Sequence, residues 1–410
     1  MKKFYFLILA ALVMAACETS PSGGGGGGGG GSASSIDGIP SDDSAVENPD
    51  ISDADTIITL PGVQTTVTTE GDDIVIRLDM TGIIDPVTGQ WLKLIGSGAG
   101  QNVYVEVDGT PKGIEVINLS EGSGVTAKAD LVFLIDNSGS MGDEADAVAD
   151  GISDWSRLLA ASGLDIRFGV VGYGYNVGSQ YTSMTSGYGI AGGMDLANYD
   201  VLNSFLNERD RYGVQRTVDF FGEKAVLFDS LVYYGDEGWY NAGGECGMQA
   251  VKFAEKYFSF RRDASRVYVN FTDDANYPGG DERWSLASIR GDKWDATRGT
   301  IHTVFSNDTL TSWVPGNLID GYEDLIKERS WEMSWITGGS ITWTDPYFTD
   351  VTLNSLEVTG AMQNSYIIRF TNVAGLMDGK PHLIHITIKT TDGSVAGELY
   401  FYVTFGGTAA

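Results

Sequence analysis

Residues 131–140 read LVFLIDNSGS. Five apolar residues followed by a short polar loop are typical of a strand that is buried on both faces and belongs to a parallel sheet. Ligands of open parallel sheets bind beyond the carboxyl ends of the strands, so Asp136 is expected to face a ligand. The spacing Asp-x-Ser-x-Ser adds the hydroxyls of Ser138 and Ser140 on the same loop. These hard oxygen donors suit Mg²⁺ or Ca²⁺ better than zinc or copper.

The chain around this stretch alternates strand and helix patterns. Apolar runs recur at residues 168–171 and 267–271. Helical patterns lie between and after these runs, over about 148–159, 247–257 and 320–329. Such alternation predicts an α/β domain over residues 128–345, with a doubly wound and mainly parallel sheet.

The segments on either side alternate apolar with polar residues, as half-buried antiparallel strands do. This pattern is clear at 74–80 and 103–107, and again at 384–389 and 399–403. Neither segment alone clearly holds enough strands for a sandwich. The economical interpretation is one β-sandwich, built from residues 55–127 and 346–410 and interrupted by the α/β domain. The second segment would open with the last helix of that domain. Two separate small β domains are the alternative.

The N-terminus reads as an export signal. Lys2 and Lys3 precede an apolar run over 4–16 that is too short to span a bilayer as a helix. The run ends in VMAAC and resembles the lipobox of bacterial lipoproteins, in which the cysteine, here Cys17, is acylated and becomes the new N-terminus. An ordinary signal peptide is the alternative. Residues 17–54 include nine consecutive glycines and few apolar side chains, so they are expected to form a flexible tether.

The lipobox resemblance implies a membrane lipoprotein that touches the membrane only through the lipid on Cys17. The residue after Cys17 is Glu18 and not the aspartate that retains many lipoproteins in the inner membrane. This favours an anchor in the outer membrane, with the protein facing the cell surface or the periplasm. The net charge of −29 argues against nucleic acid and against docking on anionic lipid. Cys246 is the only other cysteine and reads as a small buried residue.

Thr272 and Asp273 end the later apolar run at 267–271. Together with the Asp-x-Ser-x-Ser loop, they make the α/β region resemble the von Willebrand factor A family. The metal-ion-dependent adhesion site of that family uses Asp-x-Ser-x-Ser with a distant Thr and Asp. The resemblance implies that Asp136, Ser138, Ser140 and Asp273 hold one divalent cation, and either aspartate can act through water.

One loop departs from the commonest family pattern, because it reads GGECG over residues 243–247 and offers no convincing threonine. It looks like the integrin β I-like variant, which implies that Glu245 is also a metal ligand. In that variant, acids just after the serines hold a second cation, and here Asp143 and Glu144 occupy that place. In both cases the alternative is an acid favoured near a helix N-terminus by the helix dipole.

Three carboxylates would leave a divalent ion site at about −1, so an anionic ligand would be repelled unless positive charge lay nearby. Several aromatic residues fall on the expected ligand face and are candidate anchors for a partner protein. They are Tyr173, Tyr175, Trp239, Tyr240 and Tyr277. The alternative is that they pack the loops.

The sequence therefore predicts an adhesion or recognition lipoprotein, whose cation accepts an acidic side chain of a protein ligand. An enzyme is not expected. The three histidines (His302, His382 and His385) lie on expected strands, and neither His-Glu-x-x-His nor Gly-x-Ser-x-Gly occurs. A periplasmic assembly or scaffold factor is the alternative, and a metal-dependent hydrolase is less favoured.

Overall fold

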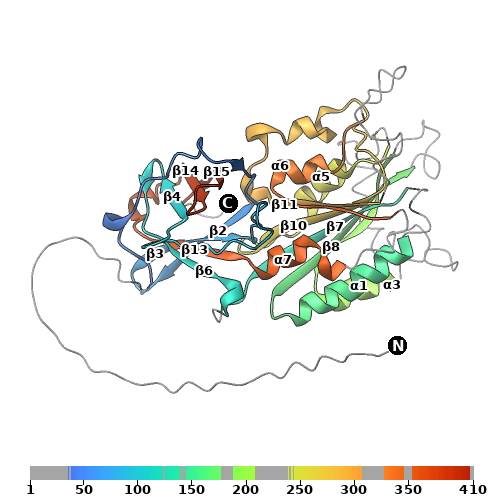
Figure 1. Ribbon diagram of the computed structural model, residues 1–410. Helices are drawn as coiled ribbons and strands as arrows, with labels where there is room; N and C mark the ends of the chain where they lie inside the picture. Colours follow the sequence, from blue (N-terminus) through green and yellow to red (C-terminus); the bar gives the residue numbers. More distant parts are fainter. Residues whose placement is uncertain are drawn as a thin grey trace, which may run out of the picture. The chain divides into compact units, whose positions relative to one another are not determined.

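The computed structural model contains a six-stranded sheet in the region expected to be α/β (Figure 1). Its description covers residues 36, 38–122, 125–138, 141, 145–176, 188–207, 239, 242, 244–306, 327–345 and 353–406. The strand order is β12-β11-β10-β7-β8-β9, and every neighbouring pair is parallel except β8 with β9. The strands are β7 (Lys128–Asp136), β8 (Asp165–Asn176), β9 (Tyr188–Ala197), β10 (Ser265–Thr272), β11 (Thr300–Phe305) and β12 (Ile341–Trp343).

The central strand β7 shows why this sheet forms. Its residues 131–135 are all 0% exposed. Leu131, Phe133 and Ile135 belong to one hydrophobic cluster, whereas Val132 and Leu134 belong to another. A strand that is covered on both faces needs apolar residues at every position, and this explains the continuous run in the sequence.

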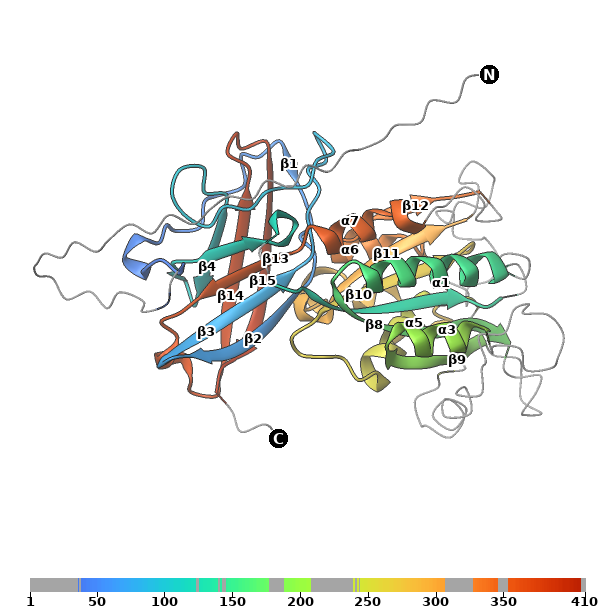
Figure 2. The same ribbon diagram turned by 90° about the horizontal axis from the view of Figure 1, so that it is seen from below.

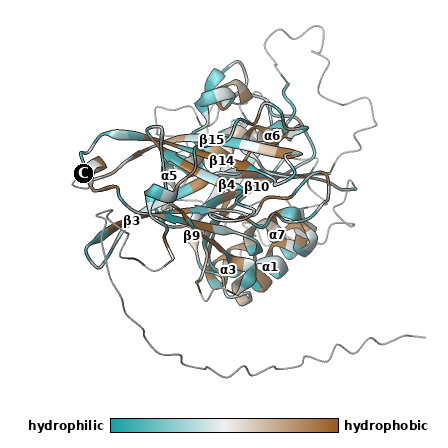
Figure 3. Ribbon diagram, turned by 60° about the vertical axis from the view of Figure 1, so that its left-hand side comes forward, coloured by the Kyte–Doolittle hydropathy of each residue, from teal (hydrophilic) through white to brown (hydrophobic). Residues whose placement is uncertain are grey.

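Helices cover both faces of the sheet. The cluster on one face includes side chains of α1 (Ala145–Ala161), α3 (Tyr199–Asn207) and α7 (Glu357–Gln363). The cluster on the other face includes side chains of α5 (Gly247–Tyr257) and α6 (Glu332–Thr337). Helices α1, α3 and α7 each carry hydrophobic and hydrophilic residues (Figure 3). The α/β class predicted from the sequence is confirmed.

One predicted helix is wrong in the part that the structure describes. Residues 327–329 are not helical, and Glu328 instead forms an isolated antiparallel bridge with Asn276. The Glu328 side chain explains this conformation, because it accepts hydrogen bonds from Ser285 Oγ and from the backbone N–H of Leu286. Residues 320–326 of the expected helix lie outside the described ranges.

The segments before and after the α/β region pair with each other in two further sheets (Figure 2). In the four-stranded sheet, Ile76 lies opposite Phe370, and in the five-stranded sheet, Val105 lies opposite Ile386. Both sheets contribute side chains to one hydrophobic cluster. The four-stranded order is β2 (Val63–Glu70), β3 (Asp73–Met80), β13 (Tyr366–Phe370) and β6 (Glu115–Asn118). The five-stranded order is β1 (Thr56–Ile57), β15 (Val395–Thr404), β14 (Pro381–Lys389), β4 (Val103–Val107) and β5 (Thr110–Pro111).

The flexible tether expected up to residue 54 is wrong over residues 38–54. Asp42 accepts hydrogen bonds from Lys112 Nζ and the backbone N–H of Gly113, both at 2.9 Å. The backbone N–H of Asn48 donates to Glu106 Oε1, also at 2.9 Å. The segment has few apolar residues, but it needs no core of its own because its polar groups form hydrogen bonds with β4 and with the chain that follows β5. Residues 17–35 lie outside the described ranges. Within those ranges, no helix has both the length and the apolar character needed to cross a membrane.

Candidate metal centre

Asp136 ends strand β7, and its side chain is fully buried. Its Oδ1 accepts a hydrogen bond from the backbone N–H of Ser138 at 3.0 Å. Its Oδ2 accepts one from the hydroxyl of Thr272, which ends the neighbouring strand β10, at 2.7 Å. The structure thus joins the ends of two strands that the sequence placed at one edge of the sheet.

Glu245 approaches the same carboxylate across the backbone of Gly174 on β8. A Cβ atom placed on Gly174 would lie 2.9 Å from Asp136 Oδ1 and 3.2 Å from Glu245 Cγ. The φ angle of Gly174 is +79°, and the pairing of β8 with β9 is irregular there. A glycine at this bulge therefore lets the two acidic side chains flank one another.

Two acidic groups of this site, Asp136 and Glu245, have a raised pKa. Burial is the largest cause of the raised pKa of Asp136, and the charges of Glu245 and Asp273 raise it further. Burial also raises the pKa of Glu245 to about 7, with contributions from Asp274 and Asp273. A bound divalent cation stabilises the ionised form of buried carboxylates that otherwise repel one another.

Lys327 supplies positive charge beside this cluster. Its Nζ lies 4.6 Å from the centroid of the Tyr277 ring. The Tyr277 hydroxyl donates to Asp274 Oδ1 at 3.1 Å, and its backbone N–H donates to the carbonyl of Glu245 at 2.8 Å. Burial lowers the pKa of Lys327, whereas the charges of Asp274 and Glu245 raise it. No pattern in the sequence pointed to Lys327, because the residue falls in a stretch that was expected to form a helix.

Three of the five aromatic residues expected on a ligand surface are buried instead. Tyr173 is 1% exposed, and its hydroxyl donates to Asn270 Oδ1 at 2.7 Å. Trp239 is 2% exposed, and its ring lies 4.9 Å from that of Trp284. Tyr277 is 7% exposed and contributes the contacts described above. The surface prediction is wrong for these residues, because their rings fill the protein interior under the loops.

Several predicted site residues lie outside the part of the chain that the structure describes. These residues are Cys17, Ser140, Asp143, Glu144 and Tyr240, together with the side chain of Tyr175. The second cation site and the lipid anchor therefore stay predictions. Cys246 is buried as expected: its Sγ lies 3.2 Å from Asn276 Oδ1, and burial raises the pKa of its thiol.

The donors brought together partly fit a hard divalent cation. Among the described residues, no group of three or more His, Cys, Asp or Glu side chains is arranged to hold a metal ion. The oxygen donors expected here also include the hydroxyls of Ser138 and Ser140. The fit depends on Asp136, a buried carboxylate in the field of two more acids. Within the described ranges, it accepts hydrogen bonds from neutral donors, namely Ser138 N–H and Thr272 Oγ–H. These features suit a site completed by a cation.

No family model matches the chain, and no curated protein matches it. Among solved structures, it is similar to an aerotolerance-related membrane protein from Bacteroides fragilis, with 14% identity over 58% of this chain and 98% of the other, at a TM-score of 0.30. Two structures of proximal thread matrix protein 1 from the mussel byssus are also similar. One, with a zinc-occupied MIDAS motif, shares 10% identity over 62% of this chain and 49% of the other, at a TM-score of 0.30. The second shares 13% identity over 56% and 46%, at a TM-score of 0.31.

Proposed function

We propose that this protein is a von Willebrand factor A-type recognition protein, which holds Mg²⁺ or Ca²⁺ at Asp136 and binds an acidic side chain of a protein partner there. The observation that carries the proposal is the buried Asp136 carboxylate, bonded to Thr272 across two strand ends and faced by Glu245 across Gly174. The ligands would be Asp136, Ser138, Ser140, Glu245 and Asp273. A divalent cation would supply an electrophilic position for the partner's carboxylate.

The residues of this chain would prepare that position. Thr272 and the backbone N–H of Ser138 fix the orientation of the Asp136 carboxylate through their hydrogen bonds. Lys327 lies on the side of Glu245 and Asp274 and offsets part of their negative charge. An approaching acidic group would therefore meet less repulsion than the carboxylates alone would create.

The proposed role is recognition and not catalysis, and the positions of the histidines support this. The Nδ1 atom of His302 lies 2.8 Å from Ser340 Oγ. His382 contacts Asp108 at 2.7 Å and Asp378 at 3.0 Å, and the ring of His385 stacks on another aromatic ring at 4.1 Å. Each histidine is thus engaged away from Asp136.

The metal site is tested by calorimetric titration of the metal-free protein with Mg²⁺ and with Ca²⁺. Asp136→Ala should lose tight binding, and Asp136→Asn should do the same while keeping the shape of the side chain. Asp200→Asn, an exposed acid in the first turn of α3, is the matched control and should bind as the wild type does. Wild-type affinity in both Asp136 variants would remove the basis of the proposal.

We further propose that the two β segments form one sandwich into which the α/β domain is inserted, and that Cys17 anchors the chain to the outer membrane. The pairing of strands from both segments supports the insertion. Mass spectrometry of the mature N-terminus should find acylated Cys17, and Cys17→Ser should release the protein from membranes. Protease treatment of intact cells then separates a surface role in adhesion from a periplasmic role in assembly.

A further inference from the structure

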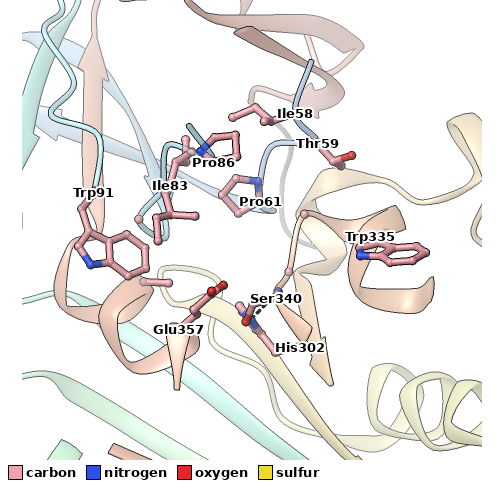
Figure 4. A pocket seen from close by; sticks show the side chains of 15 residues that line it. Ile58, Thr59, Pro61, Ile83, Pro86, Trp91, His302, Trp335, Ser340 and Glu357 are labelled. Atoms are coloured by element: carbon pink, nitrogen blue, oxygen red, sulfur yellow. Dashed lines mark hydrogen bonds between the residues drawn. The ribbon is translucent and has the colours of Figure 1, made fainter. Parts of the chain in front are cut away.

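A cavity of about 440 Å³ lies where the β segments meet the α/β region (Figure 4). It is lined by the chain after β1 and after β3, by helices α6 and α7, and by the loop that follows α6. Small-molecule sites have volumes of about 300–1,000 Å³ and often lie between domains. The cavity is distinct from the Asp136 cluster, because none of the acids of that cluster lines it.

The walls are mainly apolar and include two tryptophans. Trp91 is held by an antiparallel bridge to Ile84 and packs directly on α7, since a Cβ atom on Gly360 would lie 2.2 Å from Cζ2 of its ring. Trp335 on α6 also lines the cavity and is 54% exposed. Pro61 and Ile83 line the space between the two tryptophans in Figure 4. An indole face attracts a cation and also packs against apolar groups.

Within the described part of the chain, one charged side chain lines the cavity. This is Glu357, in the first turn of α7, whose carboxylate points toward the middle of the space in Figure 4. Glu357 has no hydrogen-bond or ion-pair partner among the residues that the structure describes, and burial raises the pKa of its carboxyl. His302 also lines the cavity but is neutral, because burial lowers its pKa to about 3 and its Nδ1 accepts a hydrogen bond from the backbone N–H of Ser340.

We propose that this cavity is a binding site for a small organic cation, with its positive charge at Glu357 and its apolar groups against Trp91 and Trp335. A single carboxylate complements a single positive charge. A ligand without positive charge would bury the Glu357 carboxylate further without offsetting its negative charge, and this is unfavourable. The tryptophans favour a cation with apolar substituents, such as a quaternary ammonium, over a small and strongly hydrated inorganic ion.

The test uses choline and its neutral carbon isostere 3,3-dimethylbutan-1-ol, which differ in charge and hardly in shape. Both are titrated into the full mature chain by NMR and calorimetry, with Mg²⁺ at a fixed concentration. Choline should bind at least about tenfold more tightly than the isostere, because only choline carries a positive charge that the carboxylate attracts. Glu357→Gln should remove this preference, and Trp335→Ala should weaken choline binding about two- to fivefold. Asp200→Asn also removes an acid from a first helical turn, but away from the cavity, and should change nothing.

Circular dichroism and thermal unfolding show whether each variant is folded, and Trp335→Ala provides a second test if Glu357→Gln fails to fold. Equal affinity for the two compounds, no measurable binding of choline, or an undiminished preference in Glu357→Gln would each overturn the proposal. Asp136→Ala should bind choline as the wild type does. Failure of the metal-site proposal and failure of this one are therefore separate results.

Discussion

Gly174→Ala should perturb the candidate metal centre through one added methyl group. Gly174 has a φ angle of +79°, and its new Cβ would lie 2.9 Å from Asp136 Oδ1. That separation is closer than such atoms approach in proteins, so the Asp136 carboxylate or the β8 backbone must move. Because Asp136 is fully buried and bonded to Thr272, it has little room to do so.

The cost can be divided between backbone and contact with a matched variant. Gly163 has a φ angle of +84°, but a Cβ there would have no atom of the described chain within 4 Å. Gly163→Ala should therefore cost only the left-handed backbone strain, about 1–2 kcal/mol. Gly174→Ala should add a steric cost of about 1–3 kcal/mol, as overpacking of a buried site does. The difference between the two variants measures the contacts with Asp136 and Glu245.

Urea unfolding of the metal-free proteins measures these costs, and calorimetric titration with Mg²⁺ measures the site. Gly163→Ala should keep the wild-type affinity for the cation, whereas Gly174→Ala should weaken it because the Asp136 carboxylate is displaced. If the two variants lose the same free energy of unfolding and bind Mg²⁺ equally well, Gly174 does not shape the site.

Three other changes have defined outcomes. Lys327→Gln should strengthen Mg²⁺ binding, and Lys327→Arg should leave it unchanged, because only the first removes positive charge beside Glu245; weaker binding in calorimetry would contradict this. The flanking carboxylates raise the pKa of His382 above 6.5, so the protonated imidazole stabilises the fold. The wild type should therefore be more stable than His382→Gln by a full and constant amount below pH 6.5, and this difference should disappear as pH rises through the higher folded pKa. Urea unfolding across pH measures the difference and its sign. Gly360→Ala should lower the free energy of unfolding by about 1–3 kcal/mol, because the new methyl group would overlap the Trp91 ring, and by clearly less in a Trp91→Ala background. Additive losses in a double-mutant cycle would exclude this contact between residues 360 and 91.

The sequence was sufficient for the α/β sheet because burial on two faces leaves a direct trace. Strand β7 supplies alternate side chains to two clusters, so residues 131–135 are all apolar. The meeting of Asp136 with Thr272 was also predictable, since parallel neighbouring strands end at the same edge of a sheet. Both predictions depend on periodicity and topology, which a single sequence carries.

Contacts between distant residues left no such trace. Tyr173 and Trp239 are residue types that are frequent at protein interfaces. Only their contacts with Asn270 and Trp284 show that both side chains are buried. Lys327 reaches Tyr277 because the bridge between Glu328 and Asn276 brings that segment alongside. Likewise, residues 38–54 look like a tether until their hydrogen bonds to the sheets are known.

The acidic cluster has one more consequence, which concerns stability. The pKa of Asp136 is higher in the fold than in the unfolded chain. The free energy of unfolding of the metal-free protein should therefore fall as pH rises above 3.8, until the folded pKa is reached. Asp136→Asn removes this charge and with it the repulsion from Glu245 and Asp273. It also removes one of the two acceptor oxygens. Without divalent cation, at neutral or higher pH, the variant should therefore unfold at a higher temperature than the wild type. A cation bound only by the folded wild type adds about 2.7 kcal/mol at a concentration one hundred times its Kd, so with Mg²⁺ or Ca²⁺ the order should reverse. Thermal unfolding without and with the cation measures the order of the two proteins under each condition. An Asp136→Asn variant that is less stable under both conditions would mean that the buried carboxylate is a structural hydrogen-bond acceptor and not a metal ligand.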